Sequence, residues 1–218
     1  MIISFANQKG GVGKTTLSVN LAFEAAFRNL DMRVLLIDAD PQASILEWSD
    51  NRQGKLPSNL SIMGMAKKTL NRDIKNVADD YQLVIIDAPP RSTDITRSAI
   101  LASDVVIVPC TPSEYDLYAS ANTIEMIREA RLYKEELISL FAISRKIVNT
   151  TIGKELRDKI KALGDDMVLL DIEICQRVAW AKSSEGLSVH ELTNANECKV
   201  EISKMFDEIC KVIGVFAK

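Results

Sequence analysis

Short apolar runs recur along the chain, and segments with helical spacing separate them. The runs are Ile2 to Ala6, Val34 to Ile37, Leu60 to Met63, Leu83 to Ile86, Val105 to Val108, Leu140 to Ile143 and Val168 to Ile174. Nearly continuous apolar runs of this length are typical of strands that are buried on both faces of a parallel sheet. We therefore expect a strand at each of these places.

Amphipathic helices are predicted between and after these runs. Thr15 to Phe27 and Ser120 to Leu132 carry apolar residues three and four positions apart. A last helix, at about Ala195 to Val215, has a predicted packing stripe of Val200, Met205, Ile209, Val212 and Phe216. Alternating strands and helices predict an α/β fold, a mostly parallel central sheet with helices on both faces. The length of 218 residues fits a single domain spanning 1–218.

The first predicted strand runs directly into a glycine-rich turn. From Lys9 to Thr16 the chain reads Lys-Gly-Gly-Val-Gly-Lys-Thr-Thr, and a helical pattern follows. A strand, a glycine turn and a helix that opens with Gly-Lys-Thr present backbone N–H groups and an ammonium group to a polyphosphate. The predicted phosphate-binding residues are Gly10, Gly11, Val12, Gly13, Lys14, Thr15 and Thr16. The usual first glycine of this motif is replaced by Gln8, and a second lysine, Lys9, precedes the glycine pair.

Carboxylates follow two other predicted strands. Asp87 ends the run from Leu83, where it is expected either to hold magnesium or to cap a turn. Asp38 and Asp40 follow the run from Val34, and strand periodicity predicts that both lie on the same side. One of them could reach the magnesium shell while the other orients an attacking water. Pro89 and Pro90 follow shortly after Asp87 and stiffen the exit from the strand that Asp87 ends. The segment after them is expected to be either a loop that responds to the γ-phosphate or a rigid turn.

Composition narrows the class of protein. The net charge of −3 excludes a chain that is basic throughout, so any contact with nucleic acid requires a local patch. The four cysteines show no C-x-x-C spacing, and no apolar run approaches the length of a membrane span, which together predict a cytoplasmic protein with reduced thiols. The single histidine, His190, is expected to be packed or at the surface, and Trp48 and Trp180 to be partly buried helix residues.

The segments Lys9 to Thr16, Asp38 to Gln42 and Asp87 to Pro90 together resemble the deviant Walker ATPases of the ParA/MinD superfamily. Ser144, Arg145 and Lys146 with Gln176 and Arg177 resemble the small plasmid-partition ATPases of the ParF kind. The resemblance implies a P-loop ATPase with ATP and Mg²⁺ as cofactors and weak basal activity. The segments after Asp38 and Asp87 would be its switch regions.

The same resemblance assigns roles to individual residues. Lys9 would be a signature lysine that reaches the phosphates bound by the partner subunit of an ATP-dependent homodimer. Lys14 would bind the terminal phosphates, and Asp40 would position the attacking water. Thr15, Asp38 and Asp87 would serve the magnesium shell.

A DNA-segregation function follows from the resemblance. The ATP-bound dimer would bind DNA without sequence preference, and a ParB-like centromere-binding adaptor would stimulate hydrolysis and release, giving a nucleoid-associated protein. Because the phosphate loop starts at residue 9, the N-terminal helix-turn-helix extension of longer ParA proteins and specific operator binding are not expected. Candidate DNA-contacting cations are Lys146, Arg177, Lys182, Lys199 and Lys204, which lie among acidic residues and could form a patch only in the dimer.

Three alternatives use the same phosphate loop. A positioning ATPase for a non-DNA cargo would need the same residues. A membrane-cycling ATPase resembling MinD would need a terminal amphipathic helix with a basic face, whereas Val212 to Lys218 offers few cations, so no membrane binding is expected. An electron-transfer ATPase resembling nitrogenase iron protein would need interface thiolates, for which Cys110 is the one candidate near the site.

Overall fold

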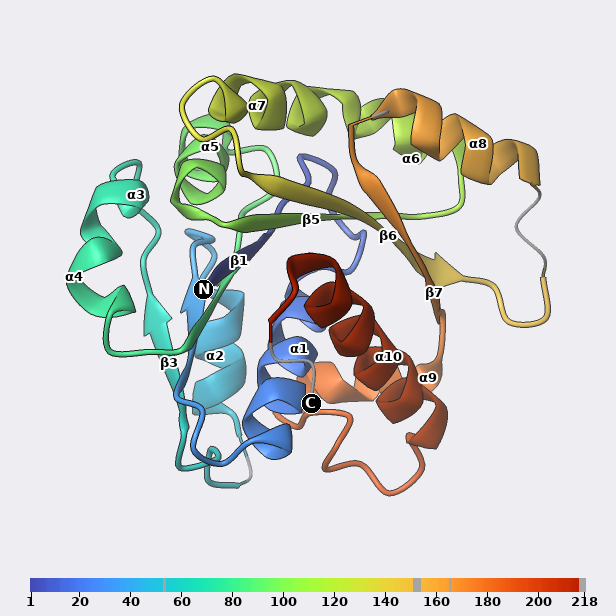
Figure 1. The fold of residues 1–218 in the computed structure, drawn as a ribbon. Coiled ribbons are helices and arrows are strands. Elements are labelled where there is room, and N and C mark those ends of the chain that lie inside the picture. The colour runs from blue at the N-terminus through green and yellow to red at the C-terminus, as the bar shows by residue number, and fades with distance from the viewer. Residues whose placement is uncertain (53, 151–153, 165, 216–218) are drawn as a thin grey trace.

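In the computed structural model, one sheet of parallel strands lies between two layers of helices (Figure 1). The structure describes residues 1–52, 54–150, 154–164 and 166–215. The strands are β1 (Ile2–Phe5), β2 (Val34–Asp38), β3 (Leu60–Gly64), β4 (Leu83–Asp87), β5 (Val105–Cys110), β6 (Ile138–Lys146) and β7 (Val168–Cys175). Every predicted strand is present. The order is β3-β2-β4-β1-β5-β6-β7, and all neighbours pair in parallel.

The helices divide between the two faces of the sheet. Their bounds are α1 (Lys14–Arg28), α2 (Ser44–Asp50), α3 (Leu70–Asp73), α4 (Lys75–Ala78), α5 (Thr93–Ala102), α6 (Glu114–Ala119), α7 (Ala121–Arg131), α8 (Lys154–Leu163), α9 (Val178–Lys182) and α10 (Asn196–Ile213), with a 3₁₀ turn at Ser183–Glu185. Helices α1, α2, α9 and α10 cover one face, and α3 to α8 cover the other (Figure 1).

Alternate residues of each central strand supply the two apolar cores. In β2, Leu36 belongs to the core on the side of α1, α2, α9 and α10, while Leu35 and Ile37 belong to the core on the opposite side. This is the period-two pattern of a strand that is buried on both sides, and it explains why the run is apolar throughout. The predicted α/β fold is confirmed.

The packing stripe predicted on the last helix is partly wrong. Met205 and Ile209 are buried, but Val200 and Val212 are 52% and 38% exposed. The buried face also carries Cys198, Ile202 and Phe206. Side chains three and four apart share a helix face, so Val200, two positions after Cys198, points away from the core. Phe216 lies outside the described residues.

The histidine and both tryptophans are packed, as predicted. Trp48 and Trp180 are buried in α2 and α9, and the Trp48 indole donates a hydrogen bond to the carbonyl of Ser183 at 2.7 Å. His190 Nε2 lies 2.8 Å from Glu24 Oε2 against α1. Trp48 thus joins α2, and His190 joins α1, to the C-terminal part of the chain.

Candidate functional site

The phosphate loop and both acidic strand ends meet at one edge of the sheet. In the strand register, Asp38 lies directly opposite Asp87, and Asp87 lies opposite Phe5, the last residue of β1. Ligands of parallel α/β sheets bind outside the carboxyl ends of the strands. A cavity of about 420 Å³ opens there. It is lined by Gly11 and the segment from Gly13 to Leu17, by Asp40 and Pro90, by the last residues of β6 and β7, and by residues that follow β7.

The turn between β1 and α1 has the backbone that its glycines predict. Gly11 and Gly13 adopt φ angles of +75° and +90°, a region that other residues rarely enter. Gly13 is the N-cap of α1, which begins at Lys14. The first N–H groups of a helix have no partner within the helix, and together with the helix dipole they attract anions.

Two lysines of the loop differ in burial. Lys14 is only 5% exposed, and its Nζ donates a hydrogen bond to the carbonyl oxygen of Lys9 at 3.0 Å. Burial lowers the pKa of Lys14, while Asp87 and Asp40 act in the opposite direction. The side chain of Lys9 is exposed. The loop therefore holds one cation inside the site and presents a second one outward.

Thr15 and Asp87 form the pair expected of a magnesium site. Thr15 Oγ1 donates a hydrogen bond to Asp87 Oδ2 at 2.6 Å. The other carboxylate oxygen, Oδ1, is buried and has no hydrogen-bond partner within the described part of the chain. Burial raises the pKa of Asp87, opposed by Thr15 and Lys14. A buried carboxylate oxygen without a partner, beside a hydroxyl group and a phosphate loop, fits Mg²⁺, which prefers oxygen ligands.

Asp38 has a different environment. Its Oδ1 accepts a hydrogen bond from the amide of Asp40 at 3.0 Å, and its Oδ2 accepts from the amides of Ile45 and Leu46 at 2.8 and 3.2 Å. Both oxygens thus hold the loop that leads into α2, although burial raises the pKa of the group. A role for Asp38 in the magnesium shell stays a prediction, which would require it to exchange these contacts.

Asp40 reaches the cavity through a turn and not through strand periodicity. Strand β2 ends at Asp38, so the predicted alternation does not extend to Asp40. Instead, Asp40 Oδ1 accepts a hydrogen bond from the amide of Gln42 at 2.9 Å, and its carbonyl accepts one from Ala43. An Asx turn of this kind fixes the side chain locally. Asp40 lines the cavity together with Lys14.

Sequence reasoning missed the residue that anchors the start of the loop. Asn7 is fully buried, and its Nδ2 donates to the carbonyl of Pro109 at 2.8 Å and to Ser120 Oγ at 3.0 Å. Its Oδ1 accepts a hydrogen bond from the amide of Lys9 at 2.9 Å. The sequence signal was an asparagine at the end of an apolar strand, which alone does not indicate a distant partner.

The far wall of the cavity comes from the ends of β6 and β7. Ser144 Oγ donates to the carbonyl of Val12 at 2.7 Å, and Gln176, Arg177 and Trp180 line the same wall. Trp180 Nε1 is buried without a hydrogen-bond partner among the residues described. This wall extends the site beyond the phosphate loop, where the nucleoside part of a ligand has room.

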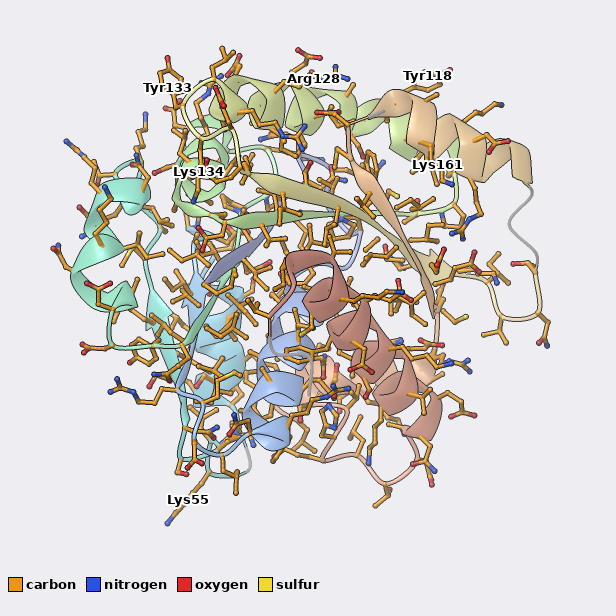
Figure 2. The ribbon with its side chains drawn as sticks, in the orientation of Figure 1. Lys55, Tyr118, Arg128, Tyr133, Lys134 and Lys161 are labelled. Carbon is orange, nitrogen blue, oxygen red and sulfur yellow. The ribbon has the colours of Figure 1, made fainter. Side chains whose placement is uncertain are left out.

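The candidate DNA-contacting cations do not form one patch on a single chain. Lys146 pairs with Glu173 at 2.6 Å, and Arg177 pairs with Glu201 at 3.0 Å. Lys182, Lys199 and Lys204 lie on α9 and α10 and make no ion pair within the described ranges. In the opposite layer, Tyr118, Arg128 and Lys161 are exposed residues of α6, α7 and α8 (Figure 2), and Arg128 pairs with Glu125 at 2.8 Å.

Two further observations concern the alternatives. Cys110 is fully buried at the end of β5, which argues against a thiolate that reaches a second subunit. No helix among the residues that the structure covers combines the length and the apolar character required to cross a bilayer.

The loop after Asp87 lies outside the sheet, as predicted, and its Pro90 lines the cavity. Whether this loop responds to the γ-phosphate stays a prediction.

Comparison with known proteins places the chain in a family. Residues 3–189 match the family described as the CobQ/CobB/MinD/ParA nucleotide binding domain. The chain is 28% identical over 211 residues to maintenance of carboxysome distribution protein A of Halothiobacillus neapolitanus, covering 95% of each chain. It is 24% identical over 226 residues to the protein ParA of Rhizobium radiobacter, covering 95% of this chain and 98% of that protein.

A solved structure has the same fold. The septum site-determining protein MinD of Pyrococcus horikoshii OT3, complexed with Mg-ADP, superposes with a TM-score of 0.72 at 23% identity, covering 100% of this chain and 98% of that one. The resemblance inferred from Lys9 to Thr16, Asp38 to Gln42 and Asp87 to Pro90 is confirmed. Since the family match extends over most of its length, the chain belongs to the CobQ/CobB/MinD/ParA nucleotide-binding family, on its ParA/MinD side.

Proposed function

We propose that the protein is a magnesium-dependent ATPase of the DNA-partition type. The observation that carries this proposal is the convergence of a buried Lys14, the Thr15–Asp87 pair and Asp40 on one cavity beneath a glycine loop. Bound Mg²⁺ would neutralise charge on the phosphates, which is what it supplies in phosphoryl transfer. Thr15 and Asp87 would hold the ion, and Asp40 would orient the attacking water.

Lys14 and the loop amides would bind the polyphosphate. The ammonium group of Lys14 now contacts the carbonyl of Lys9, a neutral acceptor within the same loop. A triphosphate would offer it a fully charged acceptor, and hydrogen bonds between charged groups are stronger than bonds to a neutral carbonyl. The bound triphosphate would thereby stabilise the charged form of Lys14, which burial disfavours.

Lys9 would act across a homodimer. Its exposure supports a role outside its own chain, because a lysine that served its own phosphates would be expected to be buried as Lys14 is. In the proposed dimer, each Lys9 reaches the phosphates bound by the other subunit. Nucleotide occupancy and assembly are then one event, and hydrolysis dissolves the dimer.

Light scattering on a hydrolysis-blocked variant tests this coupling. In saturating ATP and Mg²⁺, Asp40→Ala is expected to be a dimer, and the double variant with Lys9→Ala a monomer. Lys55→Ala in the Asp40→Ala background is the matched control, because Lys55 is an equally exposed lysine in a loop far from the cavity (Figure 2). A monomeric Asp40→Ala protein, or dimerisation that survives the loss of Lys9, would contradict the proposal.

The proposed cargo is DNA, moved with the help of a ParB-like adaptor. The relative named ParA supports this. In the dimer, a DNA surface would be built from the three candidate cations that make no ion pair among the described residues, Lys182, Lys199 and Lys204. The second candidate is a non-DNA cargo, favoured by the relative named for carboxysome distribution, which matches 95% of both chains. Both functions use the ATP-dependent dimer, and both would place the protein on the nucleoid in the cytoplasm.

Co-sedimentation distinguishes DNA binding from membrane binding, and the turnover assay tests the DNA-partition function through its adaptor. Asp40→Ala with ATP is expected to sediment with duplex DNA and not with anionic liposomes, and its DNA affinity should fall steeply from about 50 to 200 mM salt because phosphate contacts release counterions. The ATPase rate of the wild-type protein should rise on addition of DNA together with the adaptor. Binding to liposomes alone would instead support a membrane-cycling function.

A further inference from the structure

Arg145 has a strained backbone next to the phosphate loop. It lies in β6, one residue before the end of that strand, yet its φ angle is +55°. This left-handed region is unfavourable for residues with a Cβ atom, and glycine or asparagine usually occupies it. The register of β6 with β7 also shifts between Ile143 and Lys146. Irregularities of this kind commonly occur next to functional sites, where they redirect a side chain.

The strain allows two consecutive side chains to reach the same loop. Successive residues of a regular strand point to opposite faces of the sheet. Here Ser144 Oγ donates to the carbonyl of Val12, and Arg145 Nη1 donates to the carbonyl of Gly11 at 2.6 Å. A regular strand could supply one of these contacts but not both. The backbone distortion at Arg145 therefore has a visible result, a second clamp on the phosphate loop.

We propose that Arg145 is a positioning residue of the nucleotide site, which holds the Gly11 turn so that the loop amides face the phosphates before the ligand arrives. This inference rests on the proposed ATPase function. Gly11 itself needs a φ of +75°, so its conformation is easily lost without an external contact. Asn7 fixes the loop at Lys9, Ser144 fixes it at Val12, and Arg145 fixes it at Gly11, the second residue of the glycine pair.

The proposal predicts opposite effects on stability and on ligand binding. Replacing Arg145 with glycine removes the clamp and also relieves the strained φ angle. Without nucleotide, Tm should stay unchanged or rise by about 2 to 4 °C, the shift expected when strain of this size is relieved in a domain of this length. ATP affinity should fall about tenfold, because a charge-assisted hydrogen bond that orders the site is lost. A residue with a merely structural role would lower Tm and affinity together.

Four proteins decide the question: wild type, Arg145→Gly, Arg145→Lys and Arg97→Gln. Lysine at 145 keeps a cation that can reach the Gly11 carbonyl, so it should restore most of the affinity while keeping the strain. Arg97 is the control, because it is a half-buried arginine that hydrogen bonds to Glu129 and neither residue lines the cavity. Tm, the Kd for Mg·ATP by calorimetry, and KM and kcat are measured for each.

The expected result for Arg145→Gly is a Kd and a KM raised about tenfold with kcat at saturating ATP within about twofold of wild type. Wild-type Kd and KM in Arg145→Gly would overturn the proposal, as would a loss of affinity matched by a fall in Tm in both Arg145 variants. If the wild-type protein binds ATP but does not hydrolyse it, the proposed function fails, and the Kd comparison still decides the role of Arg145.

Discussion

Removing the Asp38 side chain separates a structural role from a metal-binding role at the site. The carboxylate accepts three backbone N–H groups, from Asp40, Ile45 and Leu46, at 2.8 to 3.2 Å. Hydrogen bonds to a charged acceptor contribute about 1.5 to 3 kcal/mol each. Part of this is offset by burial of the carboxylate, which raises its pKa. We expect Asp38→Ala to lower the free energy of unfolding by about 3 kcal/mol, since three amides lose their acceptor.

The assay is urea unfolding at pH 7.5 without nucleotide or Mg²⁺, followed by Mg²⁺ titration of ATP binding. Asp40→Ala is the matched control, because the carboxylate of Asp40 accepts a hydrogen bond from one amide, that of Gln42. Its expected loss is about 1 kcal/mol or less. Both variants remove one negative charge from the same loop, so a difference in stability between them reports the hydrogen bonds of Asp38 and not the charge.

The reasoning is refuted if Asp38→Ala unfolds within about 1 kcal/mol of wild type. If that same variant also required a higher Mg²⁺ concentration to bind ATP, Asp38 would belong to the magnesium shell. In that case the three backbone contacts would be incidental. The loop from Asp40 to Leu46 would then have to be stabilised by α2 alone.

The remaining predictions concern the loop, its anchor and one ion pair. Lys14→Ala should abolish ATP binding in calorimetry, and wild-type affinity would exclude the phosphate role. Asn7→Ala should lower the unfolding free energy by about 2 kcal/mol through lost buried hydrogen bonds, measured by urea unfolding, and should weaken ATP binding as well. Glu24, whose pKa is lowered by His190 and Arg28 despite burial, favours folding above its unfolded-state pKa, and this contribution is lost as pH falls through the folded-state pKa. Glu24→Gln should therefore flatten the loss of stability below about pH 4.5, and parallel curves would contradict that assignment.

The strands could be predicted from the sequence because each is buried on both faces, so the apolar signal is nearly continuous. Short helices gave no such signal. Helix α2 spans Ser44–Asp50 and α9 spans Val178–Lys182, lengths at which periodicity cannot be recognised and where tertiary contacts decide the conformation. Trp48 and Trp180 hold these two helices in the core, and the partner of Trp48 is 135 residues away.

The site residues also fall into those that a local sequence pattern identifies and those that only distant contacts define. Lys14, Thr15 and Asp87 were predicted because a local pattern, a glycine loop or an apolar strand with a terminal carboxylate, identifies each of them. Asn7 and Arg145 were not assigned their contacts, because their partners lie 102 and 134 residues away along the chain. The alternation expected at Asp40 failed for a related reason: β2 ends at Asp38, and a side chain to backbone turn takes over.

The two sides of the cavity are held in different ways, which bears on how nucleotide state could be transmitted. The phosphate loop is fixed from β5 and β6 by Asn7, Ser144 and Arg145. The loop after β2 is held instead by Asp38, which accepts the amides of Asp40, Ile45 and Leu46 and would have to exchange these contacts in order to join a magnesium shell. Conformational change should therefore occur in the loop that carries Asp40, because its anchor is itself a candidate metal ligand. This asymmetry favours the expected switch regions, because a loop that reports the γ-phosphate must move without loosening the residues that hold the rest of the nucleotide.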